Sequence, residues 1–174
     1  MKKILFLGGY LGLVAAFFAV LLAVTNEITT PRIAQIQADN FQRALLEGFP
    51  QATSYNIIDD VSGVPNTVQI IEIFHGDELI GFVYSQTVTG FVDNISYLVG
   101  INTDGYFTSF GVLSSRETPG FGTRIENPEW MNRVIDAHGS SEIDVITSAT
   151  LTTAPIIDAM SHAYEDFTRR IGGN

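Results

Sequence analysis

The stretch SYLVGINTDGYFTSFGVL, residues 96–113, decides the fold because it places two apolar runs on either side of Asp104-Gly105. An Asp-Gly pair between runs rich in β-branched and aromatic residues is a strong signal for a β-hairpin. A second pair of runs precedes it in TVQIIEIFHGDELIGFVYSQTV, residues 67–88, with the expected turn at His75–Glu78. The four strands predict an antiparallel sheet.

Helical signals lie on both sides of these strands. Downstream, Asn127 is a candidate cap with Pro128 at the start of a short helix, and apolar residues recur at helical spacing from about Thr153 to Ile171. Between them EIDVIT, residues 142–147, is expected to form a short strand. The predicted fold class is α+β: an antiparallel sheet with flanking helices, plus one N-terminal transmembrane helix.

The N-terminal segment Ile4–Val24 contains no charged residue. At about 1.5 Å per residue it spans a bilayer core of about 30 Å. Lys2 and Lys3 precede it, so the positive-inside rule predicts a cytoplasmic N-terminus and an extracytoplasmic remainder. A cleaved signal peptide is the alternative interpretation, but its apolar core is usually about 7–15 residues and no good Ala-x-Ala site follows.

The segment between the span and the sheet contains a second helical signal. Thr30 is a candidate cap with Pro31 at the first helical position, and Gly48 and Pro50 are expected to end the helix. Residues 51–66 are expected to form a loop. These boundaries predict an anchor at residues 1–25, a helical connector and loop at 26–66, and a folded domain at 67–174.

The composition excludes several classes of function. The chain has no cysteine, which rules out disulfides and cysteine-ligated metal centres. After the span it carries seven arginines and 19 acidic residues, a net charge of −12, so binding of nucleic acid is not expected. The three histidines, His75, His138 and His162, show no metal-ligand spacing, and no catalytic arrangement of side chains is predicted.

Two stretches have compositions that packing does not explain. SSRETPGFGTRI, residues 114–125, places a proline and two glycines after a strong strand, and glycines let a backbone approach a flat ligand closely. DVITSATLTTAP, residues 144–155, places five hydroxyl side chains directly before a helix. A helix N-terminus favours a bound phosphate, although the glycines and lysine of a Walker loop are absent.

These two stretches, in this order, resemble the motifs of the FMN-binding domain family. Asp144–Thr150 is similar to its flavinylation motif Asp-x-x-(Ser/Thr)-(Gly/Ala/Ser)-Ala-Thr, and GVLSSRETPGFGTRI resembles its flavin-side loop. The chain differs from the usual pattern at Ser115, where the family has histidine, and at Phe121, where it has leucine. Ser148 stands for a family glycine, and the glycine-rich approach to the first matched strand is reduced to Gly90-Phe91-Val92.

The resemblance implies that Thr150 carries FMN through a phosphoester bond. It also implies that the loop at Glu117–Gly122 lies against the isoalloxazine ring, and that Thr147, Ser148 and Thr152 donate hydrogen bonds to the phosphate. The cofactor-binding residues expected on this basis are Thr147, Ser148, Ala149, Thr150, Thr152, Glu117, Thr118, Gly120, Phe121 and Gly122. Asp144 is expected to be recognised by the flavin transferase that installs FMN.

The resemblance further implies an electron carrier in the cytoplasmic membrane, single-pass, with its C-terminal domain outside. One N-terminal span and this length are typical of the family member in Rnf-type complexes, which couple ferredoxin oxidation and NAD reduction to ion transport. Expected partners are the other membrane and iron–sulfur or flavin subunits. Alternatives are the equivalent subunit of a sodium-pumping NADH:quinone reductase, an exported flavinylated carrier outside any pump, and an anchored binding module without flavin.

Overall fold

The computed structural model describes residues 2–58, 60–140 and 143–172. Its contacts divide the chain into two units, Met1–Ala38 and Asp39–Asn174. In chain order the elements are α1 (Lys2–Gly48), β1 (Ser54–Ile58), β2 (Thr67–His75), β3 (Glu78–Thr89), β4 (Asn94–Asn102), β5 (Phe107–Ser114), the 3-10 helix η1 (Gly122–Glu126), α2 (Pro128–Val134) and α3 (Thr150–Gly172).

The first unit is the N-terminal part of α1. Its segment Gly8–Glu27 is long and apolar enough to cross a membrane, and none of it is buried. The expectation that a new helix begins at Thr30 is wrong, because α1 continues through Thr30 and Pro31. The Thr30 hydroxyl donates to the carbonyl oxygen of Asn26 at 2.7 Å instead of capping a helix start.

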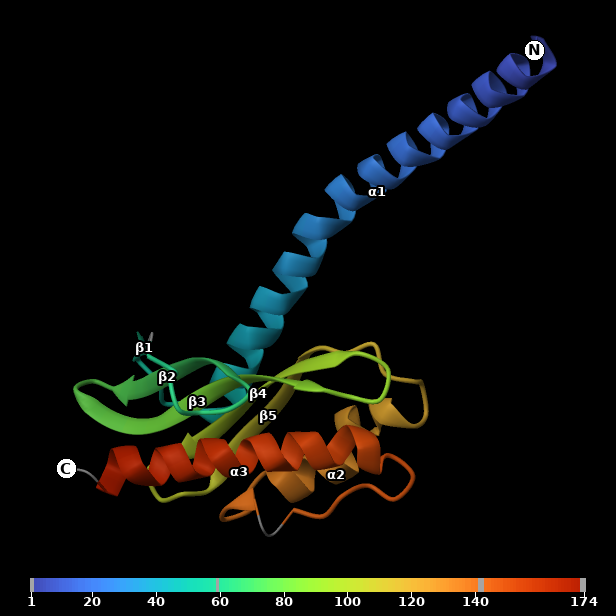
Figure 1. Cartoon of the computed structure of the whole chain (residues 1–174). Coiled ribbons are helices and arrows are strands. Elements are labelled where there is room, and N and C mark those ends of the chain that lie inside the picture. The colour runs from blue at the N-terminus through green and yellow to red at the C-terminus, as the bar shows by residue number, and fades with distance from the viewer. Residues whose placement is uncertain (1, 59, 141–142, 173–174) are drawn as a thin grey trace. The chain divides into compact units, whose positions relative to one another are not determined.

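The second unit is built on a five-stranded antiparallel sheet in the order β1-β2-β3-β4-β5, so each strand pairs with its neighbour in the sequence (Figure 1). Both predicted hairpins are confirmed, and the turn between β4 and β5 contains Gly105 at φ 87°. One strand was missed. β1 lies within residues 51–66, which were expected to be a loop, and pairs with β2 from Ser54↔Phe74 to Ile58↔Ile70.

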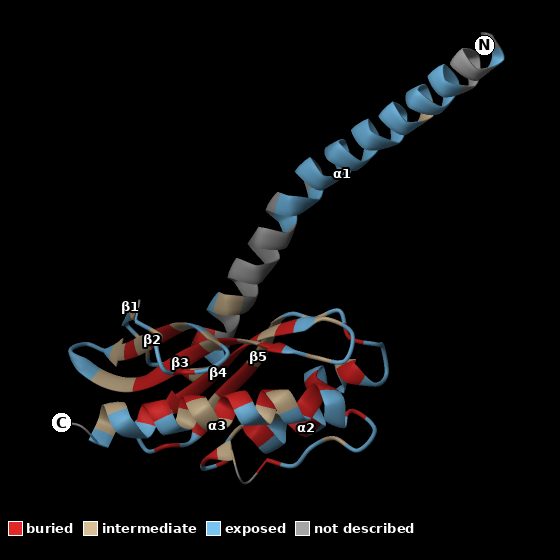
Figure 2. Ribbon diagram, in the orientation of Figure 1, coloured by how far each residue is buried: buried red, intermediate tan, exposed pale blue. Residues whose placement is uncertain are grey.

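The sheet buries apolar side chains on both faces, because neighbouring residues of a strand point to opposite sides. On one face Ile71, Val83 and Leu98 pack with Leu45 from the last turns of α1 and with Phe49, which directly follows it. The other face, with residues such as Ile70, Tyr84 and Tyr97, packs against α3 and α2. Figure 2 shows the buried residues gathered on the sheet and on the side of α3 that faces it.

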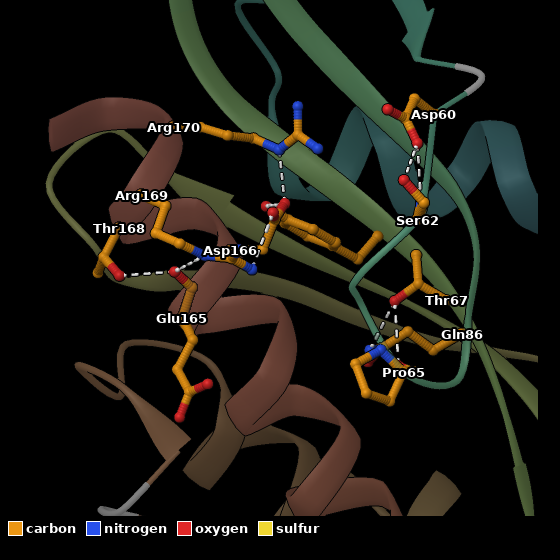
Figure 3. A network of polar contacts seen from close by, with 11 residues as sticks. Asp60, Ser62, Pro65, Thr67, Gln86, Glu165, Asp166, Thr168, Arg169 and Arg170 are labelled. Carbon is orange, nitrogen blue, oxygen red and sulfur yellow. Dashed lines mark hydrogen bonds and ion pairs between the residues drawn. The ribbon is translucent and has the colours of Figure 1, made fainter. Parts of the chain in front are cut away.

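Polar side chains attach α3 to its face of the sheet. Tyr97 donates to the carbonyl of Ile156 at 3.1 Å, and Gln86 donates to the carbonyl of Ala159 at 2.8 Å. Near the other end of the helix, Tyr84 donates to the buried carboxyl of Asp166 at 3.1 Å. Arg170 pairs with the same carboxyl at 2.5 Å (Figure 3). These bonds fix the position of α3 along the sheet.

The connection from β5 to α3 differs partly from expectation. The short helix is confirmed as α2, and the side chain of Asn127 caps it by accepting from the N–H of Glu129 at 3.1 Å. The strand expected at residues 142–147 is wrong, because the described residues 143–147 form no strand. α3 begins at Thr150, three residues earlier than expected, so Thr150 is its first residue.

Strand register brings three segments to one end of the sheet. The β3–β4 turn at residues 90–93 follows Thr89, which pairs with Asn94. Ser114, the last residue of β5, pairs with Ser96 near the start of β4. The loop that follows Ser114 therefore lies near the β3–β4 turn, and the first residues of α3 complete this end.

Candidate functional site

A cavity of about 390 Å³ opens where these three segments meet. It is lined by Phe91, Glu117, Thr118, Phe121, Gly122, Ser148, Ala149, Thr150, Leu151 and Thr152. Eight of the ten residues expected from the sequence line it, and the structure adds Phe91 and Leu151. Thr147 lies instead at a second cavity, and Gly120 lines neither.

Glu117 is the centre of the cavity wall. Only 5 % of its surface is exposed, and its carboxyl group accepts from the N–H of Val92 and from the hydroxyl of Thr152, both at 2.9 Å. The first bond reaches the β3–β4 turn and the second reaches α3. A single side chain therefore holds together all three segments of the site.

Two glycines leave room for the Glu117 side chain. A Cβ atom added at Gly90 would collide with Oε1 of Glu117, and one added at Gly122 would collide with Oε2 and lie 2.5 Å from its Cβ. Gly120 is needed for a different reason: its φ is 80°, and a Cβ there would meet nothing within 4 Å. Gly120 permits the turn, whereas Gly90 and Gly122 permit close packing.

The turn before α3 separates the five hydroxyl side chains into two groups. Thr152 and Thr153 are buried, and Thr153 accepts from the N–H of Ile146 at 3.2 Å while donating to the carbonyl of Ala149 at 3.1 Å. Thr147, Ser148 and Thr150 are exposed. Thr150 is thus an exposed residue at the helix N-terminus, whereas the hydroxyl of Thr152 is bonded to Glu117.

The turn itself depends on Ser148, which has a positive φ of 74°. This left-handed conformation favours glycine, and for serine it costs on the order of 1 kcal/mol. It explains in physical terms why a glycine fits this position of the motif.

Arg124 is a residue that the sequence analysis missed. It lies in η1, and its guanidinium donates to the carbonyl of Gly120 at 3.0 Å and to the hydroxyl of Ser148 at 3.1 Å. A longer contact of 3.5 Å reaches the carbonyl of Thr147. Arg124 therefore connects the glycine-containing loop to the turn before α3, a pairing of positions that no local sequence signal indicates.

The rim of the cavity is unusually apolar for a surface. Phe91 and Leu151 are each 66 % exposed and Phe121 is 56 % exposed. Three large apolar side chains around one cavity are typical of a site for a flat, apolar group. Thr150, at the N-terminus of α3, lines the same cavity. The apolar side chains suit an aromatic ring and the helix N-terminus suits a phosphate, so the cavity suits a ligand that carries both groups. FMN has this chemistry, and the cavity volume falls within the usual range for such ligands.

The described residues include no group of three or more His, Cys, Asp or Glu side chains that is arranged to hold a metal ion.

Comparisons with known proteins agree with this geometry. Residues 90–165 match the FMN-binding domain family, and residues 1–47 match the RnfG N-terminal region. The first match begins at Gly90 and includes every residue that lines the cavity.

Two curated relatives match over most of their length. The G subunit of the ion-translocating oxidoreductase complex of Methanosarcina acetivorans is 27 % identical over 87 % of this chain and 88 % of its own. The G subunit of the Na(+)-translocating ferredoxin:NAD(+) oxidoreductase complex of Acetobacterium woodii is 25 % identical over 92 % of this chain and 89 % of its own. The crystal structure of Shewanella oneidensis NqrC superposes with a TM-score of 0.60 at 13 % identity, covering 81 % of this chain and 100 % of that one, which shows a shared fold.

Proposed function

The chain belongs to the FMN-binding domain family, with an RnfG N-terminal region ahead of that domain, and we propose that it is the membrane-anchored FMN electron carrier of an ion-translocating ferredoxin:NAD oxidoreductase complex. Relatives that share nearly the full length of this chain are the G subunits of such complexes. When bound, FMN supplies the one-electron chemistry that the side chains of this protein lack.

The observation that carries the proposal is the shared cavity. Glu117 brings the loop after β5 and the start of α3 together, and the exposed residue Thr150 lines the cavity between them. A turn alone needs no such cavity, and a helix cap needs no exposed hydroxyl at the first helical position.

Thr150 is the proposed attachment residue for FMN. Its oxygen stands at the N-terminus of α3, where unpaired backbone N–H groups and the positive end of the helix dipole stabilise a phosphoester. Attachment keeps the flavin at a high effective concentration on the side of the membrane where no free FMN replaces a lost one. A flavin transferase forms the bond, and the exposed Asp144 belongs to the segment that the transferase recognises.

The ring is held by the other side of the cavity. Phe91 and Phe121, which line the cavity with exposed rings, would pack against the isoalloxazine, and Gly122 lines the same cavity beside Glu117. Fixed N–H groups near the ring tune its potential by stabilising negative charge. No side chain is required as a proton donor for this role.

The proposed location is the cytoplasmic membrane, with Lys2 and Lys3 inside and the FMN domain outside. The partners are the other redox and membrane subunits of the complex. Protease added to the extracytoplasmic side should degrade the domain, and the intact protein should copurify with those subunits. Cleavage only by protease added to the cytoplasmic side would show that the domain lies in the cytoplasm and would contradict the proposed orientation.

The decisive experiment compares Thr150→Val with Thr168→Val, both expressed together with a flavin transferase. Thr150→Val removes the nucleophilic oxygen and keeps the side-chain shape, so covalent flavin should disappear from both the intact mass and the fluorescence on a denaturing gel. Thr168→Val removes an exposed threonine hydroxyl from the same helix, outside the motif and the cavity, and should keep its flavin. Fluorescence retained by Thr150→Val would refute the assignment.

A further inference from the structure

Arg124 makes contacts that the stability of the fold does not require. Its side chain is exposed, and its acceptors are the exposed Ser148 and the carbonyl oxygens of Gly120 and Thr147. Exposed contacts of this kind contribute about 0–1 kcal/mol to folding. Holding a long, charged side chain between two loops for so little stabilisation suggests a further role.

The electrostatics of the site indicate that role. The part of the chain after the span has a net charge of −12, and the carboxyl of Glu117 already lines the cavity. A phosphoester on Thr150 adds another negative group. Among the hydrogen bonds of the described residues, Arg124 supplies the one cationic side chain that reaches residues 147–150.

The geometry allows direct contact with such a group. Ser148 and Thr150 are two residues apart, so their Cα atoms are separated by at most about 7.6 Å. A guanidinium has five N–H donors, and its three contacts leave donors free. Arg124 also lines a second cavity of about 410 Å³ together with Thr147, so there is open space beside its side chain.

We propose that Arg124 is the phosphate-binding residue of this site, which neutralises and positions the phosphoester on Thr150. The inference rests on the proposed function and goes beyond it, because it assigns a specific cation to one end of the cofactor. The alternative is a purely structural role, in which Arg124 only connects the turn at Gly120 to Ser148 by hydrogen bonds.

The test separates the phosphate from the ring by using two ligands. The full chain in detergent carries Thr150→Val, so that no covalent bond forms, and fluorescence titration measures the binding of FMN and of riboflavin, which lacks the phosphate. Arg124→Gln should weaken FMN binding by about three- to tenfold and leave riboflavin binding unchanged. Arg124→Lys should retain part of the FMN preference, because it keeps the charge without the planar fork.

Arg116→Gln is the matched control. Arg116 is an exposed arginine of the neighbouring loop and pairs with Asp93 at 3.5 Å, so the substitution removes the same charge without touching the turn before α3. It should leave the ratio of FMN to riboflavin affinity unchanged. Equal weakening of both ligands by Arg124→Gln would overturn the proposal in favour of the structural role.

A second measurement uses the flavinylated protein and does not depend on free-ligand affinity. The ³¹P resonance of the phosphoester should shift in Arg124→Gln and stay in place in Arg116→Gln. An unchanged resonance in both variants would overturn the proposal. Absence of covalent flavin from the wild-type chain would instead refute the proposed function, so the two failures are distinguishable.

Discussion

Glu117 allows a quantitative prediction, because its side chain joins three segments of the site. Replacing it with alanine removes the acceptor for the Thr152 hydroxyl, which is 2 % exposed, and for the N–H of Val92. Leaving a buried donor unpaired costs about 1–3 kcal/mol, and the space left beside Gly90 and Gly122 adds about 1 kcal/mol. Water reaches the N–H of Val92 because Val92 is exposed. Glu117→Ala should therefore lower the free energy of unfolding by about 2–4 kcal/mol.

Trp130 provides the assay. It is the only tryptophan of the chain and is 4 % exposed, so its fluorescence should report unfolding of the domain while the anchor stays in detergent. For a domain of this size the expected loss lowers the melting temperature by about 6–15 °C. Glu117→Gln should lose about 1 kcal/mol, because its amide oxygen can accept from Val92 and its amide nitrogen can donate to Thr152.

Glu129→Ala is the control for this prediction. Glu129 is likewise a glutamate whose carboxyl group accepts a hydrogen bond, from Arg133 at 3.1 Å, but its side chain is 77 % exposed. Its loss should change the melting temperature by no more than about 2 °C. If the melting temperature of Glu117→Ala equalled those of Glu129→Ala and the wild type, the conclusion that Glu117 holds the three segments of the site together would be refuted.

Three further predictions concern stability. Gly122→Ala should cost about 1–3 kcal/mol because its Cβ collides with Glu117; a double-mutant cycle should show that Glu117→Ala lowers this cost without abolishing it, because the carboxyl group is removed and the Cβ of residue 117 remains. Ser148→Gly should relieve the positive φ and raise stability by about 0.5–1 kcal/mol in thermal melts, and a loss would refute the strain argument. Burial raises the pKa of Tyr84 well above its ordinary 10.0, and Asp166 raises it further. The folded state therefore keeps a proton on Tyr84 that the unfolded state releases, and above about pH 10 this residue should lower stability by about 1.4 kcal/mol per pH unit; Tyr84→Phe should reduce the measured slope by that amount, and an identical slope would contradict the assignment.

The parts of the fold that the sequence predicts are those with local signals. The turn at Asp104-Gly105 and the cap at Asn127 are determined by residues within a few positions of them, and both are confirmed. β1 has no such signal, because its residues become a strand only by pairing with β2 about 16 positions later. Thr30 and Pro31 carry a helix-start signal that the continuous α1 overrides.

The start of α3 was misjudged for a specific reason. The apolar residues that recur at helical spacing, the only signal used for this helix, extend no earlier than about Thr153, so the polar residues before them gave no indication of a helix. The structure begins the helix at Thr150 and keeps Pro155 inside it, where its missing N–H leaves the Leu151 carbonyl without that bond. Leu151 is exposed, so its carbonyl can bond to water. The shift matters for function because it makes Thr150 the first helical residue.

The site was predicted as a set of residues and not as an arrangement. Family motifs pointed to both segments, and eight of the ten residues line one cavity. The role of Glu117 was invisible, because its partners Val92 and Thr152 lie 25 and 35 positions away. The role of Arg124 was not predicted for the same reason, because its contact with Ser148 spans 24 positions.

The five hydroxyl side chains before and within the start of α3 perform two kinds of task, and helix geometry separates them. Thr152 and Thr153 point inward, where one bonds to Glu117 and the other bonds to both sides of the turn. Thr150 lies at the same helix start but remains exposed. The buried pair thus holds the backbone in place while an exposed hydroxyl stays free for chemistry. A site that must accept a covalent group after folding needs this separation, because a hydroxyl bonded within the core is unavailable to a transferase.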